Sequence, residues 1–263
     1  MSLVFASISP HPPIMIPTIG KENIDQVEKS IKSLKELNQK LLQIQPETII
    51  VLSPHGEFFS DAFNINTNAE YAADFEQFGD FATKLTFKPD LEFINRFKEQ
   101  VETKMPVVLT QHKNLDHGSS VPLFYLAEGL KDVKIVPINY CLLNFQKHIE
   151  FGEELKEAIF DTEKKIAVIA SGDLSHRLSK DAPAGFSKRG KEFDKKLIKL
   201  LKEKKTDNIL NMDPQLIEEA GECGLRSFLI MLGIVQKMNY EFEVLSYEAP
   251  FGVGYLVGEF IFK

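Results

Sequence analysis

Short apolar, β-branched runs alternate along this chain with longer segments in which apolar residues recur every three or four positions. The short runs predict strands, and the longer segments of helical periodicity predict helices. The main expected strands are Leu3–Ile8, Thr48–Leu52, Val107–Leu109, Lys134–Asn139 and Lys165–Ala170. The main expected helices run from Gly20 to about Gln45 and over Leu91–Val101, Val121–Leu130, Phe145–Phe160 and Ser187–Lys204. Strands that alternate with helices are typical of an α/β fold.

The remaining expected elements suggest that the sheet is not purely parallel. They are a short helix from Asp213-Pro214, an apolar helix from Gly221–Gly224 through Val235, short strands at Ala62–Asn66 and Ala82–Phe87, and a final antiparallel pair of Tyr240–Tyr247 and Gly254–Phe262. No internal repeat or linker divides the chain. We therefore expect one α/β domain over residues 1–263, with a central mixed sheet flanked by helices.

Composition and charge narrow the classes of function. The 263 residues are 43% hydrophobic and carry a formal net charge of -7, which argues against a nucleic-acid surface because such surfaces need a basic patch. Only two cysteines are present, Cys141 and Cys223, so no disulfide framework is expected. The chain shows no signal-peptide pattern and no apolar run of membrane-spanning length. We expect a cytoplasmic protein with no membrane or nucleic-acid partner.

Three of the six histidines follow predicted strands within a few residues. His11 comes after Leu3–Ile8, His55 after Thr48–Leu52, and His176 after Lys165–Ala170. In an open α/β sheet, ligands bind outside the carboxyl ends of the strands. Imidazoles delivered to that edge from separate strands can converge on one point. The pattern therefore predicts a metal site or an acid–base site.

His11 and His55 share the local string Ser-Pro-His, each directly after an apolar run. The prolines around His11 restrict the backbone, and a metal ligand benefits from such preorganisation. Either residue could instead be a histidine of a surface turn. Because the same string occurs twice, we favour a pair of metal ligands.

A site with two histidines needs at least one more ligand, and Glu222, Glu219 and Cys223 are the candidates. Two histidines and one carboxylate suit non-haem Fe(II), whereas a cysteine favours softer ions. Alternatively, Glu222 is a carboxylate that stabilises the N-terminus of the following helix. The residues alone leave the third ligand open.

Two further histidines could take part in chemistry. His176 lies three residues after Asp173, whose carboxylate could orient the imidazole and raise its basicity; alternatively Asp173 only caps a helix. His117 could hydrogen-bond a substrate or an anion at the start of the helix that follows it. His112 and His148 lie in amphipathic, lysine-containing surroundings, and we expect both on the surface.

Taken together, the motifs resemble a known family. The chain is similar to the LigB-type catalytic subunit of class III extradiol ring-cleavage dioxygenases, especially to the branch related to Memo and AmmeMemoRadiSam-system proteins. The likeness spans nearly the whole chain and implies one α/β domain with a buried metal pocket. The strings that carry it are Ser9-Pro10-His11-Pro12-Pro13, Ser53-Pro54-His55-Gly56, Asp116-His117-Gly118, Ser171-Gly172-Asp173-Leu174-Ser175-His176 and Glu222-Cys223-Gly224.

The resemblance implies a role for each candidate residue. His11, His55 and Glu222 would bind Fe(II), with zinc or another divalent metal as the alternative. His176 would be the general acid–base, with Asp173 setting its tautomer, and His117 would line the substrate site. The substrates would be O₂ and a small aromatic of the catechol or aminophenol type. A homo-oligomer or a small partner subunit is also implied.

Cys223 departs from the pattern of the ring-cleaving enzymes. Memo-like relatives carry a cysteine at about this place, so the second hypothesis is a metal-binding redox or regulatory protein without ring cleavage. A third hypothesis is a zinc hydrolase built on the same pocket.

Overall fold

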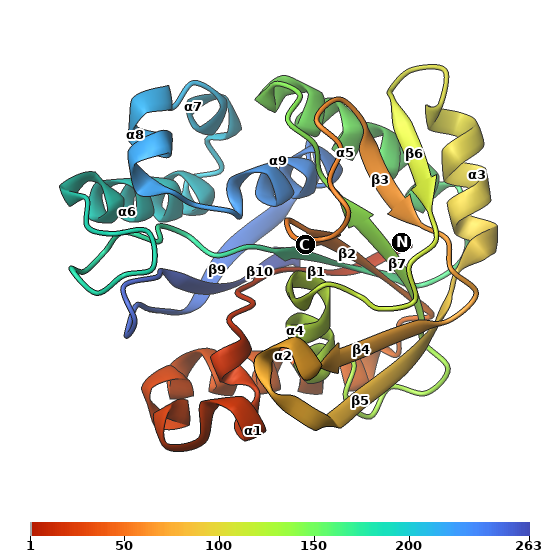
Figure 1. Ribbon diagram of the computed structural model, residues 1–263. Helices are drawn as coiled ribbons and strands as arrows, with labels where there is room; N and C mark the ends of the chain where they lie inside the picture. The colour runs from red at the N-terminus through yellow and green to blue at the C-terminus, as the bar shows by residue number, and fades with distance from the viewer. Residues whose placement is uncertain (1) are drawn as a thin grey trace.

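The computed structural model describes residues 2–263 and is organised around one large sheet (Figure 1). Its strands are ordered β4-β5-β7-β2-β8-β1-β10-β9, and β3 joins through β7 and carries β6 at its outer edge. The strands are β1 Leu3–Ser9, β2 Thr48–Ser53, β3 Phe63–Asn66, β4 Tyr71–Phe75, β5 Asp80–Pro89, β6 Val107–Thr110, β7 Lys134–Asn139, β8 Ile166–Ser171, β9 Tyr240–Glu248 and β10 Tyr255–Phe262.

The centre of the sheet is parallel and its margins are antiparallel. Strands β7, β2, β8 and β1 run in the same direction, whereas β10 pairs antiparallel with β1, and β9 antiparallel with β10. In the parallel register, Ser9 lies opposite Ser171 and Leu52 opposite Ala170. The carboxyl ends of β1, β2 and β8 therefore meet at one edge. The predicted mixed α/β fold is confirmed.

Helices cover both faces of the sheet (Figure 1). The α-helices are α1 Pro17–Gly20, α2 Glu28–Ile44, α3 Leu91–Val101, α4 His117–Leu126, α5 Phe145–Phe160, α6 Lys188–Lys202, α7 Thr206–Leu210, α8 Pro214–Ala220 and α9 Leu225–Ile234. Short 3₁₀ helices are η1 Pro13–Met15, η2 Lys21–Val27 and η3 Glu76–Phe78. One hydrophobic cluster joins the sheet to α3, α5, α6 and α9, and a second joins it to α2 and α4.

Coverage on both faces explains why the central strands are apolar at successive positions. Ile50 and Leu52 of β2 belong to the cluster with α5 and α9, whereas Ile49 and Val51 belong to the cluster with α2 and α4. Successive side chains of a strand point to opposite faces, so each position needs an apolar residue when both faces are covered. Every residue of β2 and β8 is accordingly buried.

Two helix boundaries differ from the prediction. The helix expected from Gly20 begins as the 3₁₀ segment Lys21–Val27, and the α-helix starts only at Glu28. The helix expected from Val121 begins earlier, at His117, because the Asp116 side chain caps it by accepting a hydrogen bond from the Ser119 amide. This earlier start places His117 on the first turn of α4.

The sheet also contains one strand that was not predicted from the sequence pattern. Tyr71–Phe75 forms β4 and pairs antiparallel with β5.

Among residues 2–263, no helix has the length and apolar character needed to cross a membrane.

Candidate metal centre

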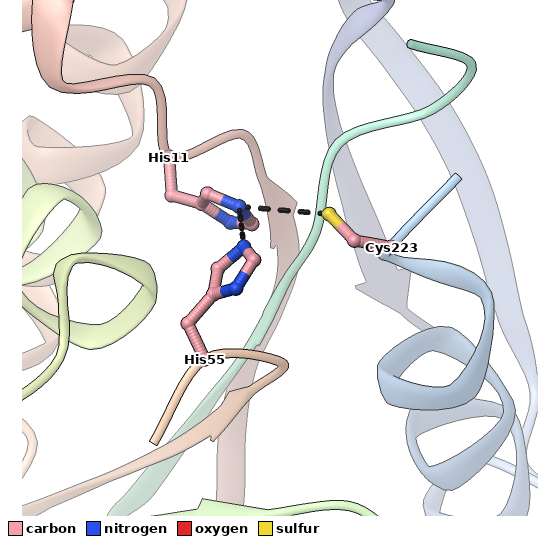
Figure 2. Close-up of side chains that lie close together, drawn as sticks. All are labelled: His11, His55 and Cys223. Carbon is pink, nitrogen blue, oxygen red and sulfur yellow. Dashed lines mark hydrogen bonds between the residues drawn. The ribbon is translucent and has the colours of Figure 1, made fainter. Parts of the chain in front are cut away.

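The imidazoles of His11 and His55 meet at the carboxyl edge of the sheet (Figure 2). His11 follows β1 and His55 follows β2, and their Nε2 atoms lie 2.9 Å apart. Cys223, in the loop between α8 and α9, places its Sγ 3.6 Å from His11 Nε2. One ligand atom from each of the three residues falls within 4.8 Å of the others. Two imidazoles and a thiol at this spacing form a donor set for a divalent transition metal.

A hydrogen-bond chain behind His11 determines which of its ring nitrogens faces the site. Ser171 Oγ lies 2.5 Å from the carbonyl oxygen of Gly118 and 2.9 Å from His11 Nδ1. The hydroxyl has one proton, which goes to the carbonyl because a carbonyl can only accept. His11 Nδ1 must therefore donate to Ser171 Oγ. The lone pair is left on Nε2, which is the atom that faces His55 and Cys223.

Desolvation within this group of rings lowers the pKa of the imidazoles, although the His55 side chain is itself exposed at the edge of the site. His11 is 2% exposed, and desolvation, followed by the neighbouring His117 and His176, lowers its pKa well below the usual value. Desolvation and the charge of His11 lower the pKa of His55 to about 3. Desolvation also lowers the pKa of His117. Neutral imidazoles are the form that binds metals.

The Cys223 sulfur is held by the loop that follows β8. Asp173 donates its backbone N–H to Cys223 Sγ at 3.3 Å, and the Asp173 carbonyl accepts from the amide of Gly224 at 3.1 Å. Burial raises the pKa of the Cys223 thiol, and the nearby Asp173 carboxyl adds to this effect. A bound cation reverses that balance, because metal coordination deprotonates a thiol.

Glu222 does not join this group, which differs from its predicted role as a ligand. Its carboxylate accepts a hydrogen bond of 2.6 Å from the amide of Leu225, the first residue of α9. This is the helix-terminal position that the sequence left open as the alternative. Glu219 is also engaged elsewhere, since its carboxylate accepts from Gln215 on α8. The geometry favours Cys223 as the third ligand.

Asp173 contacts His11 rather than the histidine it was expected to orient. Its Oδ1 accepts from the backbone N–H of His11 at 3.1 Å, and its Oδ2 lies 3.8 Å from His11 Nε2. Burial raises the pKa of the Asp173 carboxyl to about 6. Within residues 2–263, no hydrogen bond joins Asp173 to His176, whose Nδ1 is buried and has no partner. The predicted orienting bond is therefore not made.

His176 is placed by its backbone. Its amide donates to the carbonyl of Ala220 at 3.1 Å, and the Ser175 hydroxyl donates to the same carbonyl at 2.8 Å. Asp194 of α6 accepts from the Ser175 amide at 2.9 Å and from the hydroxyl of Tyr247 at 2.6 Å. Three hydrogen bonds therefore hold the His176 loop: two to Ala220, at the end of α8 and three residues before Cys223, and one to α6.

His117 lies against both histidines of the site. Its ring stacks on His55 with centroids 4.3 Å apart, and it meets His11 edge-on at 5.4 Å. Phe78 packs edge-on against its other side at 5.4 Å. The ring of His117 therefore lies beside the imidazoles of the candidate metal centre.

A cavity of about 450 Å³ lies next to His55. Its wall combines the loop after β2 with β3, β6, the end of β7 and the segment before α4. The motifs in the sequence marked only His55, Gly56 and Asp116 among these residues, because the others come from several elements and form no local pattern.

The two histidines expected on the surface have different environments. His112 is exposed and pairs with Glu57, as expected for a surface residue. His148 is fully buried, so the prediction for it was wrong. Its ring packs edge-on against Phe63, and Nε2 lies 3.1 Å from the carbonyl oxygen of Cys141. The surroundings of His148 look amphipathic in the sequence, but its side of α5 packs against the rest of the protein.

Comparisons with known proteins agree with one another. The family profile described as "Catalytic LigB subunit of aromatic ring-opening dioxygenase" matches residues 5–258. "Protein CA_C1420" of Clostridium acetobutylicum is 33% identical over 97% of this chain, which spans only 57% of that protein's length. The "3,4-dihydroxyphenylacetate 2,3-dioxygenase" of Escherichia coli is 26% identical, with 92% of each chain covered.

Two further similarities extend the comparison. The "2-aminophenol 1,6-dioxygenase beta subunit" of a Pseudomonas species is 22% identical over 98% of this chain and 93% of its own. Among solved structures, the uncharacterized protein JW3007 of Escherichia coli K12 superimposes with a TM-score of 0.70 at 17% identity. The match covers 97% of this chain and 98% of that one, which shows a shared fold.

We expect Ser171→Ala to weaken metal binding by about 10–100-fold, because His11 Nδ1 loses the acceptor that keeps the Nε2 lone pair in the site. Competition titration of the chelator-treated protein with Zn(II) measures the change. Ser7→Ala is the matched control, since Ser7 lies on the adjacent strand and its buried hydroxyl has no hydrogen-bond partner in the described chain. Equal affinities for the two variants would contradict this role of Ser171.

Cys223→Ser should weaken metal binding more than Ser171→Ala does, whereas Glu222→Gln should retain the metal. The reason is that only the Cys223 sulfur lies within the ligand group. Co(II)-loaded protein gives a second readout, because a thiolate ligand produces a sulfur-to-cobalt charge-transfer absorption. Loss of metal in Glu222→Gln together with its retention in Cys223→Ser would restore the carboxylate as the third ligand.

Asp194 should make the protein less stable as the pH rises from about 4 to 6. Burial raises the pKa of Asp194 to about 6, whereas an aspartate in an unfolded chain titrates near ~3.9. Between these values the native state binds more protons, so the free energy of unfolding falls with rising pH. Asp194→Asn removes this contribution, which amounts to at most ~3 kcal/mol.

Urea unfolding at pH 4 and pH 6 measures the difference. The stability of the wild type relative to Asp194→Asn should decline between the two pH values. Asp181→Asn, at an exposed position, serves as the control and should follow the wild type. An unchanged pH dependence in Asp194→Asn would contradict the prediction.

Proposed function

The chain belongs to the family of catalytic LigB subunits of aromatic ring-opening dioxygenases, and we propose that it is a non-haem Fe(II)-dependent extradiol dioxygenase. Its substrates would be O₂ and a catechol- or aminophenol-type ring. The observation that carries the proposal is the pair of neutral imidazoles whose Nε2 atoms lie 2.9 Å apart at the carboxyl edge of the sheet. The ring-cleaving relatives support it, although they are only 22–26% identical.

The residues that would hold the metal are His11, His55 and Cys223. When bound, Fe(II) would supply Lewis acidity toward a substrate hydroxyl and redox chemistry with O₂. The chain's own contribution is to present the two Nε2 lone pairs in fixed positions. His11 is locked by Ser171, and His55 is stacked on His117. Zinc or another divalent ion also suits this donor set.

His176 is proposed as the general acid–base. Its Nδ1 is buried and makes no hydrogen bond with the residues the structure describes, so no partner fixes the tautomer of the ring. The imidazole would take the proton of a substrate hydroxyl and return it later. The backbone contacts with Ala220 and, through Ser175, with Asp194 keep the imidazole near the ligands. Asp173 supports the site through His11, because its carboxylate accepts a hydrogen bond from the His11 backbone N–H.

His117 would line the substrate site rather than transfer protons. Its ring closes one side of the site between His55 and Phe78. An aromatic substrate placed beside this wall would meet flat, uncharged surfaces, which suit a planar ring. The wall would also keep bulk water away from the reacting oxygens.

Cys223 favours a second candidate function. A thiol in place of a carboxylate suits softer ions, so the same pocket could serve a metal-binding redox or regulatory protein without ring cleavage. A homo-oligomer or a small partner subunit remains part of the proposal, in line with the relative named as a beta subunit.

Anaerobic reconstitution with Fe(II), followed by oxygen uptake with catechols and 2-aminophenol, tests the proposal. We expect oxygen consumption and a coloured ring-fission product. His176→Ala should keep its iron and lose turnover by ~10²–10⁴-fold. Lys180→Ala, an exposed position four residues further on, should change neither iron content nor turnover.

Two results would contradict the proposal in different ways. Stoichiometric metal without oxygen uptake for any substrate would favour the redox or regulatory function. Loss of the metal in His176→Ala would show that this histidine is a ligand and not the acid–base.

A further inference from the structure

We infer that the cavity beside His55 receives the ring substituent of the substrate and selects an uncharged, hydrogen-bonding substituent over a carboxylate. This inference rests on the proposed function, because it assumes that an aromatic ring binds at the metal centre. It names the substrate class that the family alone leaves open.

The cavity borders the candidate metal centre at His55. Its volume of about 450 Å³ falls within the range of small-molecule sites, and His55 itself forms part of its lining. Asp116, which caps the helix that carries His117, lines it as well. A ring bound at the ligand atoms therefore has this cavity as its neighbour on the His55 side.

The cavity exists because β7 changes its neighbour along its length. β5 pairs with Lys134 and Ile135 of β7, whereas β3 pairs with Ile138 and Asn139. Pro137 lies at the change and lines the cavity. A proline has no backbone N–H, so the gap leaves no donor unpaired at that residue. The cavity therefore results from the way the strands of the sheet pair.

The buried part of the lining contains neutral amides and one hydroxyl beside the apolar Leu115 and Pro137. Asn64 donates to the carbonyl of Glu57 at 3.0 Å and accepts from the hydroxyl of Thr110 at 2.8 Å. Asn139 is 5% exposed, and its amide nitrogen donates to the carbonyl of Ser53 at 3.1 Å. Its Oδ1 lies 3.4 Å from the Asn64 amide nitrogen. These bonds hold the amides in place before a ligand arrives.

Asn139 keeps hydrogen-bonding capacity to spare. An asparagine amide has two N–H donors and two lone pairs, and the bonds above use one of each on Asn139. A group that both donates and accepts, such as a carboxamide or a hydroxyl, can use the remaining pair. A carboxylate can only accept, so it would leave part of this capacity unused.

Asn139 is also coupled to the loop that carries His55. A Cβ atom on Gly56 would lie 2.2 Å from Asn139 Oδ1, so the loop backbone rests directly on the amide. A ligand bound by Asn139 therefore sits against the segment that positions a metal ligand.

The lining carries two carboxylates, since Glu57 lies at its exposed rim and Asp116 is half-buried, and its cationic groups lie at the exposed rim. Glu57 and His112 pair with each other at 2.5 Å. Lys113 is exposed, and its Nζ lies 3.9 Å from a carboxylate oxygen of Glu70. A carboxylate placed inside would lose water and face Glu57, whereas a neutral polar group would lose little.

The test compares two probes of almost the same shape, 3,4-dihydroxybenzamide and 3,4-dihydroxybenzoate. Their binding to the metal-loaded protein is measured by calorimetry under anaerobic conditions, so no turnover is needed. We expect the amide to bind at least ~10-fold more tightly than the carboxylate. Equal binding, or tighter binding of the carboxylate, would overturn the inference.

Variants that fill the cavity test whether the preference for the amide arises in the cavity or elsewhere at the metal centre. Thr110→Phe places a ring in the cavity and should remove the preference for the amide, and Thr110→Leu is a smaller filling variant should the first fail to fold. Leu109→Phe adds the same ring at the neighbouring position, which does not line the cavity, and should keep the preference. A preference that survives both fillings would contradict the location.

Failure of the inference differs from failure of the proposed function. A preference for the amide that Thr110→Phe abolishes, with no oxygen uptake for any ring, would support the binding site and reject ring cleavage. Oxygen uptake with both probes and no preference between them would support ring cleavage and reject the inference.

Discussion

The parallel register of β1, β8 and β2 is the constraint on which the candidate site depends. Ser9 lies opposite Ser171 and Leu52 opposite Ala170, so three strand ends reach the same edge at the same height. His11 and His55 follow these ends within two residues, and the loop to His176 begins at the third. A shift of one residue in this register would turn a whole strand over and separate the ligand atoms.

Hydrogen bonds behind the site determine which nitrogen of His11 faces the other candidate ligands. Ser171 stands between His11 and the carbonyl of Gly118, and it thereby connects three segments that are distant in the chain. Because the Ser171 hydroxyl carries one proton and donates it to Gly118, it can only accept from His11, and this decides the tautomer of His11. The ligand atom is selected by a residue that does not touch the metal position.

The loops on the other side of the site are joined to each other through their backbones. The segment after β8 and the segment before α9 bond to each other in both directions. The Asp173 carbonyl accepts from the Gly224 amide, and the Ala220 carbonyl accepts from the His176 amide. Gly172 lies so close to Gly224 that a Cβ atom there would come within 2.1 Å of the Gly224 Cα. The segment with His176 and the segment with Cys223 therefore form one unit, supported from α6 by Asp194.

Much of this protein could be predicted from the sequence, because local patterns carry the information. Apolar runs and helical periodicity indicated the strands and helices, and the position of His11, His55 and His176 after strands indicated a shared edge. Only the tertiary structure decided which way the individual side chains point. Glu222 and Cys223 are neighbours in the chain, yet the carboxylate faces the α9 amide and the sulfur faces His11. Likewise, the burial of His148, the role of Ser171 and the cavity at Pro137 each arise from segments far apart in sequence. Composition and spacing describe one segment at a time, whereas these features are made by side chains from several segments that meet only in the folded chain.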